Sequence, residues 1–254
     1  MVSAVGADAG KTSVAMAAIA GLTRTYGQGR VAYFKPIGQG LVEVEGRKFD
    51  RDAVLAKAQF SIKAELKHMS PVAVDERFTR RSLDGDVDIE EQWSLIEESF
   101  FKLQREHDFV VIEGMGHCAA GSVFGMSNAA VARRLGVGAV LVANGGLGST
   151  FDELELNRQL LEREGVDLRG IVVNKVRVDK YDFIRRSLSR AVAERWGVPL
   201  LGCVPYGVGF DRPSLRDLEM LYGRELLSAR DHALRYVVAL GYSGLHSFVS
   251  SFHI

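Results

Sequence analysis

The chain has 254 residues, 47% hydrophobic and 25% charged, which is ordinary for a soluble globular protein and suits one large α/β domain or one domain with an appendage. Its 32 Lys and Arg residues equal its 32 Asp and Glu residues, so no global positive charge indicates nucleic acid as the main partner. The two cysteines, Cys118 and Cys203, lie far apart and indicate a reducing compartment, the cytoplasm or an organelle stroma, rather than a disulfide.

The first informative segment lies between a short apolar run and a helical run. Val2–Val5 is typical of a strand, and Ser13–Leu22 of a core helix whose apolar part is too short to span a membrane. Between them, Gly10-Lys11-Thr12 matches the end of a phosphate-binding loop, whose backbone N–H groups surround a polyphosphate at a helix N-terminus. In such a loop the lysine reaches the terminal phosphates and the threonine hydroxyl binds Mg²⁺.

The loop departs from the usual spacing. Four residues normally separate the first glycine from Gly-Lys-[Ser/Thr], but Gly6 leaves three, and Val5 stands where that glycine is expected. Small residues permit a tight turn here, so we expect a shortened loop that still closes. The alternative is a glycine-rich helix entry that binds nothing. The candidate nucleotide-binding residues of this segment are Gly6, Ala7, Asp8, Ala9, Gly10, Lys11, Thr12 and Ser13.

Short apolar, β-branched runs alternate with helical patterns along the rest of the chain. Further strands are expected at Val31–Phe34, Phe109–Ile112, Ala139–Ala143, Ile171–Val173 and Leu200–Val204. Helices are expected at Arg51–Gln59, Glu90–Arg105, Asn128–Leu135, Phe151–Glu164 and Asp182–Arg195. This alternation predicts an α/β fold with a mainly parallel sheet, helices on both faces, and ligands at the carboxyl ends of the strands.

Two candidate site residues follow the second expected strand. Lys35, at the strand end, is expected to stabilise a transferred phosphoryl group or to bind a substrate carboxylate; the alternative is a solvated surface lysine. Asp50 and Asp52 lie at the start of the next helix. We expect Asp52 to be a second Mg²⁺ ligand, and the alternative is ordinary N-capping by either aspartate. The irregular segment His68–Asp88 is expected to be a loop or lid.

Three later strands end in candidate site residues. Glu113 follows Phe109–Ile112, as in the Walker B arrangement, where an acid at a strand tip helps to hold Mg²⁺; the alternative is an exposed acid. Asn174 ends the fifth strand, and its side-chain amide suits the edge of a nucleobase. Arg177 stands where a guanine-specific Asn-Lys-x-Asp motif requires aspartate, so guanine specificity is not supported. Pro205 ends a segment that is expected to form a wall for the base.

The pattern changes after residue 212. Leu215–Leu227 is expected to form one more helix, and Ala233–Ile254 is apolar and carries no motif. We therefore divide the chain into a P-loop NTPase domain, residues 1–212, and a helical, apolar C-terminal extension, residues 213–254. We expect the apolar tail, Ala233–Ile254, to pack on the domain or against a partner, and the sequence leaves both open.

Together these segments resemble the dethiobiotin synthetase superfamily of P-loop proteins over roughly residues 2–210. The resemblance is carried by Gly10–Thr12, Lys35–Gly40, Asp52–Ala53, Val111–Gly114, Asn174 and Leu200–Pro205. It implies a homodimer that binds ATP and Mg²⁺ and closes a cyclic urea on a diamine through a phosphorylated carbamate. It further implies phosphate and transition-state stabilisation by Lys11 and Lys35, Mg²⁺ ligation by Thr12, Asp52 and Glu113, and adenine contact by Asn174.

The segment after Glu113 departs from that family. It reads Gly-Met-Gly-His-Cys-Ala-Ala-Gly-Ser-Val where a true synthetase has Gly-Ala-Gly-Gly. The segments Met69–Val72, Phe78–Arg81 and Gly145–Gly148 are more similar to synthetase-like domains found alone or at the front of some phosphotransacetylases, often called cobyrinic acid diamide synthase-like.

Two functions therefore stay open, beside a third and weaker one, loss of catalysis with a retained fold. The first is an ATP-dependent, ligase-like enzyme that phosphorylates a small-molecule carboxylate or the carbamate of a diamine. The second is a regulatory or assembly ATPase without ligase activity.

Overall fold

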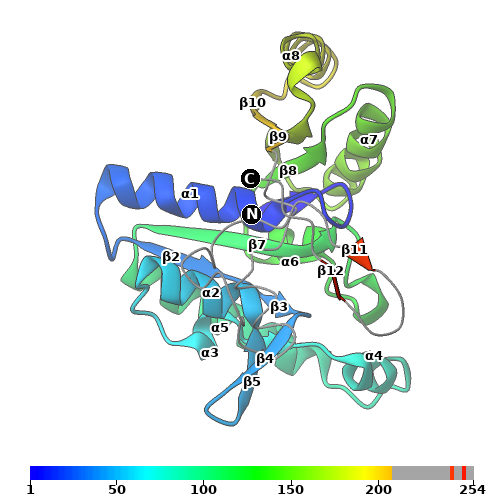
Figure 1. Ribbon diagram of the computed structural model, residues 1–254. Coiled ribbons are helices and arrows are strands. Elements are labelled where there is room, and N and C mark those ends of the chain that lie inside the picture. Colours follow the sequence, from blue (N-terminus) through cyan, green and yellow to red (C-terminus); the bar gives the residue numbers. More distant parts are fainter. Residues whose placement is uncertain (208–240, 243–247, 250–254) are drawn as a thin grey trace. The chain divides into compact units, whose positions relative to one another are not determined.

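The computed structural model describes residues 1–207, 241–242 and 248–249 (Figure 1). The chain divides into two units, Met1–Pro205 and Tyr206–Ile254. Of the second unit, the structure describes strands β11 (Gly241–Tyr242) and β12 (Phe248–Val249), which pair antiparallel. The expected helix after residue 214 and most of the expected apolar tail lie outside the described residues. The domain boundary at residue 212 therefore stays a prediction.

The first unit is built on a six-stranded sheet in the order β10-β9-β8-β1-β7-β2, and all neighbouring strands in it are parallel. Every strand overlaps an expected one, which confirms the α/β fold class. In β2 all four residues are buried, because both faces of a parallel sheet are covered. The strands are β1 (Val2–Ala4), β2 (Val31–Phe34), β7 (Phe109–His117), β8 (Ala139–Asn144), β9 (Leu168–Val176) and β10 (Leu200–Pro205).

Helices connect these strands, and Figure 1 shows α1 on one side of β7 and α6 on the other. Side-chain caps begin several of them: at α5, Asp88 accepts a hydrogen bond from the Glu91 N–H, and at α6, Ser127 accepts one from the Ala130 N–H. The α-helices are α1 (Lys11–Tyr26), α2 (Arg51–Phe60), α3 (Leu66–Met69), α4 (Glu76–Leu83), α5 (Ile89–Glu106), α6 (Asn128–Arg134), α7 (Gly148–Arg163) and α8 (Tyr181–Trp196); η1 (Ser122–Phe124) and η2 (Val178–Lys180) are 3-10 helices.

The segment expected to be an irregular loop or lid contains regular structure, so that expectation was wrong in its local structure. Strand β6 (Val72–Ala73) pairs with β3 (Ile37–Gly38), and α4 follows. Helix α4 forms because Asp75 caps it through the Phe78 N–H, and because the Phe78 ring packs edge-on against Phe124 with 5.6 Å between centroids.

A hairpin that the sequence analysis missed leads into α2. Strands β4 (Leu41–Val44) and β5 (Arg47–Asp50) pair antiparallel. The two connecting residues, Glu45 and Gly46, have φ of 51° and 75°, as the tight turns of two-residue hairpins require. The hairpin fixes the position of Asp50 at the start of α2.

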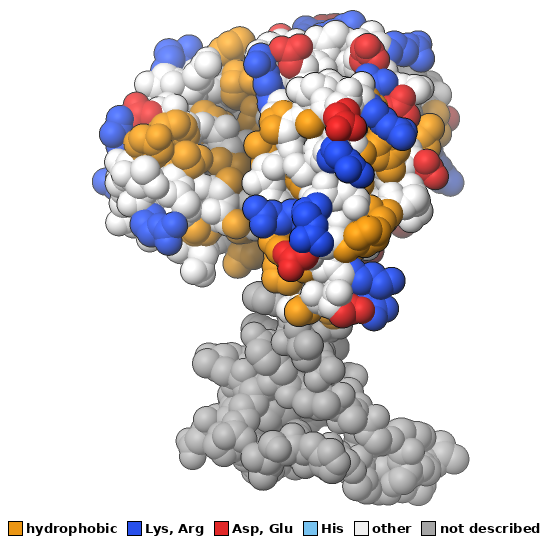
Figure 2. All heavy atoms as spheres, turned by 90° about the horizontal axis from the view of Figure 1, so that it is seen from above, with side chains coloured by type: hydrophobic (Ala, Val, Ile, Leu, Met, Phe, Trp, Pro, Cys, Tyr) orange, Lys and Arg blue, Asp and Glu red, His pale blue; other side chains and the backbone are white. Residues whose placement is uncertain are grey.

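The described surface carries both signs of charge. On the face that Figure 2 shows, basic and acidic side chains are interspersed among apolar ones, and no field of one sign covers it. No helix in the described part of the chain is both long and apolar enough to cross a bilayer.

Candidate functional site

The phosphate-loop candidate joins β1 to α1, and two of its residues adopt left-handed backbone conformations. Asp8 has φ 57° and Gly10 has φ 92°. A Cβ at Gly10 would collide with the side-chain nitrogen of Asn174, so glycine is needed there for space as well as for conformation. Gly6, where the sequence suggested a turn glycine, has no positive φ and open space beside it.

Two side chains from the end of β9 hold the carbonyl groups of this loop. The Asn174 amide nitrogen donates to the Ala9 carbonyl oxygen at 2.9 Å. The Lys175 ammonium donates to the Asp8 carbonyl oxygen at 2.6 Å. The structure thus places Asn174 against the loop itself, and its expected contact with adenine stays a prediction.

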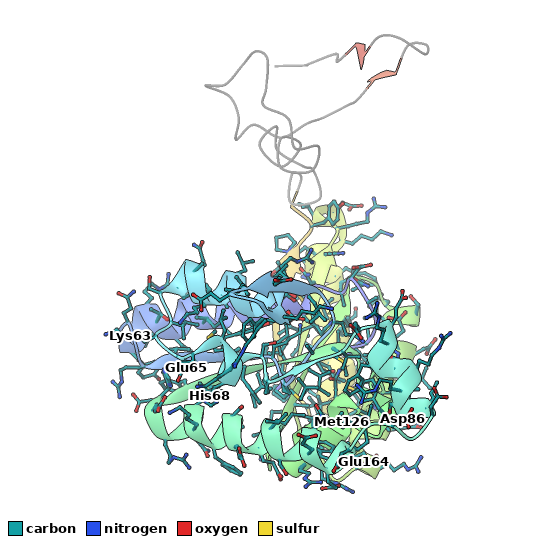
Figure 3. All side chains as sticks on the ribbon, turned by 90° about the horizontal axis from the view of Figure 1, so that it is seen from below. Lys63, Glu65, His68, Asp86, Met126 and Glu164 are labelled. Atoms are coloured by element: carbon teal, nitrogen blue, oxygen red, sulfur yellow. The ribbon has the colours of Figure 1, made fainter. Side chains whose placement is uncertain are left out.

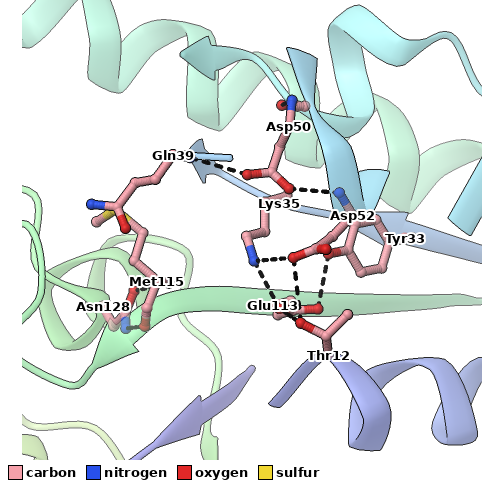
Figure 4. Close-up of polar contacts among 10 residues, drawn as sticks. Thr12, Tyr33, Lys35, Gln39, Asp50, Asp52, Glu113, Met115 and Asn128 are labelled. Atoms are coloured by element: carbon pink, nitrogen blue, oxygen red, sulfur yellow. Dashed lines mark hydrogen bonds and ion pairs between the residues drawn. The ribbon is translucent and has the colours of Figure 1, made fainter. Parts of the chain in front are cut away.

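The residues expected to bind Mg²⁺ come together beside the loop (Figure 4). The Thr12 hydroxyl donates to Glu113 Oε1 at 2.8 Å and lies 3.3 Å from Asp52 Oδ2. The Lys35 ammonium lies 2.7 Å from the same Glu113 oxygen and 3.2 Å from the same Asp52 oxygen. One hydroxyl and one ammonium therefore share one oxygen of each carboxylate.

Sheet geometry explains this convergence. Successive side chains of a strand point to opposite faces, so Tyr33 and Lys35 share a face. β2 and β7 pair in parallel with Tyr33 opposite Val111, which brings Glu113 level with Lys35. Glu113 is fully buried, and β7 continues past it to His117. The expectation that the strand ends at this acid was therefore wrong, because β7 stays paired with β1 past the acid, with His117 opposite Ala4.

Asp50 takes the expected capping role, and Mg²⁺ ligation by Asp52 stays a prediction. Asp50 caps α2, accepting hydrogen bonds from the Asp52 N–H at 2.9 Å and from the Gln39 N–H at 3.0 Å. Asp52 is thereby free to point toward Thr12 and Lys35. Asp50 also lies against Gly38, where a Cβ would come within 2.6 Å of the Asp50 Cβ.

The ionisation of the lysines follows from this cluster. Burial lowers the pKa of Lys11, and the nearby charge of Lys35 lowers it further, more than the neighbouring acids raise it. For Lys35 burial also acts downward, but Glu113 and Asp50 outweigh it and raise the pKa above its usual value. Lys35 is therefore a fully charged counter-ion at neutral pH.

A buried tyrosine completes the environment of Glu113. The Tyr33 hydroxyl donates to Glu113 Oε2 at 2.9 Å, the carboxylate oxygen that neither Thr12 nor Lys35 contacts. Burial, followed by the charge of Glu113, raises the pKa of Tyr33 well above its usual value. The phenol therefore stays protonated and keeps donating.

We expect Tyr33→Phe to lower the free energy of unfolding by about 1–3 kcal/mol, because the substitution leaves a fully buried carboxylate oxygen without its donor. Urea unfolding followed by circular dichroism measures the change. The exposed Tyr26 provides the matched control, since Tyr26→Phe removes a hydroxyl with no such burial. Equal stability changes for the two variants would contradict this role of Tyr33.

The remaining expected site residues lie outside this cluster of hydrogen bonds, and Pro205 lies on the opposite edge strand of the sheet. Ser13 is exposed in the first turn of α1, and Ala7 is exposed in the loop. Pro205 ends the edge strand β10, is exposed, and pairs with Val176 of β9. No finding tests Pro205 as a wall for the base.

The donor set fits Mg²⁺. This ion prefers oxygen ligands and is usually held by one or two carboxylates together with substrate phosphates. Thr12, Asp52 and Glu113 offer one hydroxyl and two carboxylates at the end of the phosphate loop. Among the described residues, no group of three or more His, Cys, Asp or Glu side chains is placed to hold a metal ion.

The sequence model of the AAA domain family AAA_26 matches residues 1–214. The chain belongs to this family. The ATP-dependent dethiobiotin synthetase of Saccharopolyspora erythraea is 30% identical to this P-loop NTPase over 218 residues, 86% of this chain and 92% of that protein. The resemblance to dethiobiotin synthetase-like P-loop NTPases is thereby confirmed.

Two other relatives are much longer than this P-loop NTPase. The phosphate acetyltransferase of Pseudomonas putida is 30% identical over 239 residues, 89% of this chain but 32% of that protein. The cobyric acid synthase of Moorella thermoacetica is 36% identical over 120 residues, 45% of this chain and 22% of that protein. The chain thus spans a third or less of either relative. Its family and its synthetase relative make it an ATP-binding protein with ligase-like kinship.

Proposed function

We propose that the chain is a Mg²⁺- and ATP-dependent, ligase-like enzyme that activates a carboxylate or carbamate by phosphorylation. One observation carries the proposal: Thr12, Asp52 and Glu113 converge within hydrogen-bonding distance beside the phosphate loop. The Lys35 ammonium contacts the same oxygens of Asp52 and Glu113 that the Thr12 hydroxyl contacts. The synthetase relative, matched over 92% of its length, supports the same chemistry.

In this proposal each group has a defined task. Backbone N–H groups of residues 6–11 bind the phosphates, and Lys11 reaches the terminal ones. Mg²⁺, when bound by Thr12, Asp52 and Glu113, neutralises phosphate charge. An oxygen of the acceptor carboxylate or carbamate attacks the γ-phosphorus, ADP leaves, and an amine then displaces phosphate from the acyl phosphate. Lys35 stabilises the charge of the group in transfer.

Lys11→Ala tests nucleotide binding. We expect calorimetric titration of Mg²⁺-ATP to show an affinity loss of about 2–5 kcal/mol, roughly thirtyfold to several thousandfold, because a charged partner of the phosphates is removed. Lys63→Ala removes an exposed lysine charge elsewhere and is expected to bind like the wild type. Equal ATP affinity in wild type and Lys11→Ala would contradict the assignment of residues 6–12 as a phosphate-binding loop. A parallel titration with GTP tests base preference.

A regulatory or assembly ATPase is the second candidate. The segment after Glu113 favours it, because this segment departs from that of a true synthetase. Asn128 holds the segment in place: its side chain accepts a hydrogen bond from the Met115 N–H at 2.9 Å and donates one to the His117 carbonyl at 2.8 Å. ATP turnover stimulated by added diamines or carboxylates supports the ligase. Turnover that responds to none of them, with partner capture that depends on nucleotide, supports the regulatory role. The homodimer belongs to the proposal and is tested by light scattering.

A further inference from the structure

At the end of β9, the side chains of Asn174 and Lys175 reach the phosphate loop. Their hydrogen bonds fall on consecutive carbonyl groups, those of Ala9 and Asp8. Lys175 is exposed, yet it has φ 56°. A left-handed conformation is uncommon for a lysine, and strained residues of this kind cluster at functional sites.

A hydrogen bond that holds a backbone carbonyl also fixes the direction of the N–H group that follows it. A peptide unit is planar and trans, so its C=O and the following N–H point in opposite directions. Holding the Asp8 carbonyl therefore aims the N–H of Ala9, and holding the Ala9 carbonyl aims the N–H of Gly10. Both carbonyls are drawn toward β9, so both N–H groups turn away from it. N–H groups aligned in this way are what a phosphate loop uses to bind its ligand.

The backbone around Lys175 is fixed by close packing. Gly145, just after β8, lies so near that a Cβ there would come within 2.7 Å of the Lys175 carbonyl oxygen and 2.8 Å of the Val176 nitrogen. The end of β8 thus presses on the end of β9 at the point where β9 holds the loop. From this position the Lys175 side chain reaches the Asp8 carbonyl through an exposed hydrogen bond.

We propose that Lys175, with Asn174, is a positioning residue that orients the Ala9 and Gly10 N–H groups toward the α- and β-phosphates of a bound nucleotide. This rests on the proposed nucleotide binding. The role is a hydrogen bond to protein backbone and includes no contact with phosphate. It also explains how a loop one residue shorter than usual keeps its amides aligned: the neighbouring strand supplies the constraint.

Lys175→Met tests this, because methionine keeps most of the unbranched stem and removes the ammonium. The affinities for ADP and for ATP are expected to fall by the same factor, about tenfold, the value of one hydrogen bond from a charged group. In the nucleotide-free protein, NMR order parameters of the Ala9 and Gly10 amides are expected to fall from the rigid range near 0.85 toward or below about 0.6.

Lys63→Met is the matched control, since Lys63 lies at the outer edge of the molecule (Figure 3) and is exposed; it should leave affinities and order parameters unchanged. A larger loss for ATP than for ADP would mean that Lys175 contacts the γ-phosphate and would overturn the proposal. Unchanged order parameters in Lys175→Met would overturn it as well. If the wild type binds neither nucleotide, the proposed function fails, and the order parameters alone decide whether Lys175 positions the loop.

Discussion

Lys35→Met is expected to lower the free energy of unfolding by about 3–5 kcal/mol in metal-free buffer and to abolish ATP turnover while ATP affinity stays nearly intact. The substitution removes the cation that lies 2.7 Å from Glu113 and 3.2 Å from Asp52. Glu113 is fully buried, so its charge cannot be screened by water. Guanidinium unfolding measures the first effect, and phosphate release measures the second.

The pH dependence of this effect has a definite sign. The folded-state pKa of Lys35 is raised, so its stabilising contribution is complete below the usual lysine pKa of about 10 and is lost as the pH rises through the raised value. A measurement at pH 7–8 therefore records the whole contribution.

Two further measurements separate this role from ordinary packing. Added Mg²⁺ is expected to raise the melting temperature of Lys35→Met more than that of the wild type, because the ion restores positive charge between the two acids. Lys48→Met is the matched control: Lys48 pairs with Asp75 at 3.3 Å in an exposed position, and surface pairs contribute about 0–1 kcal/mol. A loss for Lys35→Met no larger than for Lys48→Met would show that the buried pairing does not stabilise the fold.

The sheet was predictable because its strands contain short apolar runs. Val31–Phe34 and Ala139–Ala143 are continuous hydrophobic runs, as strands covered on both faces require. The approach of Lys35 to Glu113 was predictable for a related reason, whereas Asp52 reaches them through the β4–β5 hairpin that leads into α2. In a parallel sheet the carboxyl ends of the strands meet at one edge, so polar residues at those ends come together in space.

The site features that were missed depend on register and backbone conformation. Tyr33 looks like an ordinary core residue, and only the pairing of β2 with β7 brings its hydroxyl to Glu113. A signal was present, since Tyr33 precedes Lys35 by two residues and so shares its face of the strand. Lys175 gave no such signal, because sequence patterns do not predict a positive φ at a lysine.

Helix α4 was missed for a different reason. Its sequence, Glu-Arg-Phe-Thr-Arg-Arg-Ser-Leu, is mostly polar, and none of its residues is buried. Phe78 and Leu83 are the apolar residues of this helix, too few to predict a core helix from the sequence, and the capping aspartate at position 75 was its clearest local sign. Contact between Phe78 and Phe124, far apart in sequence, supplies what the local pattern lacks.

Gly10→Ala is expected to weaken ATP binding by about 2–4 kcal/mol, roughly thirtyfold to a thousandfold, without unfolding the protein. Gly10 has φ 92°, which strains any other residue, and the added methyl group would collide with the Asn174 amide. Either Asn174 releases the Ala9 carbonyl or the loop shifts, and both disturb the N–H groups that bind phosphate. Calorimetry measures the affinity. Gly21→Ala, where α1 leaves open space, is the control and should bind ATP normally.

The collision and the backbone strain at Gly10 can be separated, because only the collision involves Asn174. In an Asn174→Ala background the side-chain amide is absent, so Gly10→Ala brings only the backbone strain of the positive φ and no collision. Gly10→Ala should therefore reduce affinity less in that background than in the wild type, with a coupling energy of about 0.5–3 kcal/mol, as for residues in direct contact. If the affinity losses of Gly10→Ala and Asn174→Ala instead add fully, backbone strain alone accounts for the effect of Gly10→Ala, and the collision with Asn174 contributes nothing.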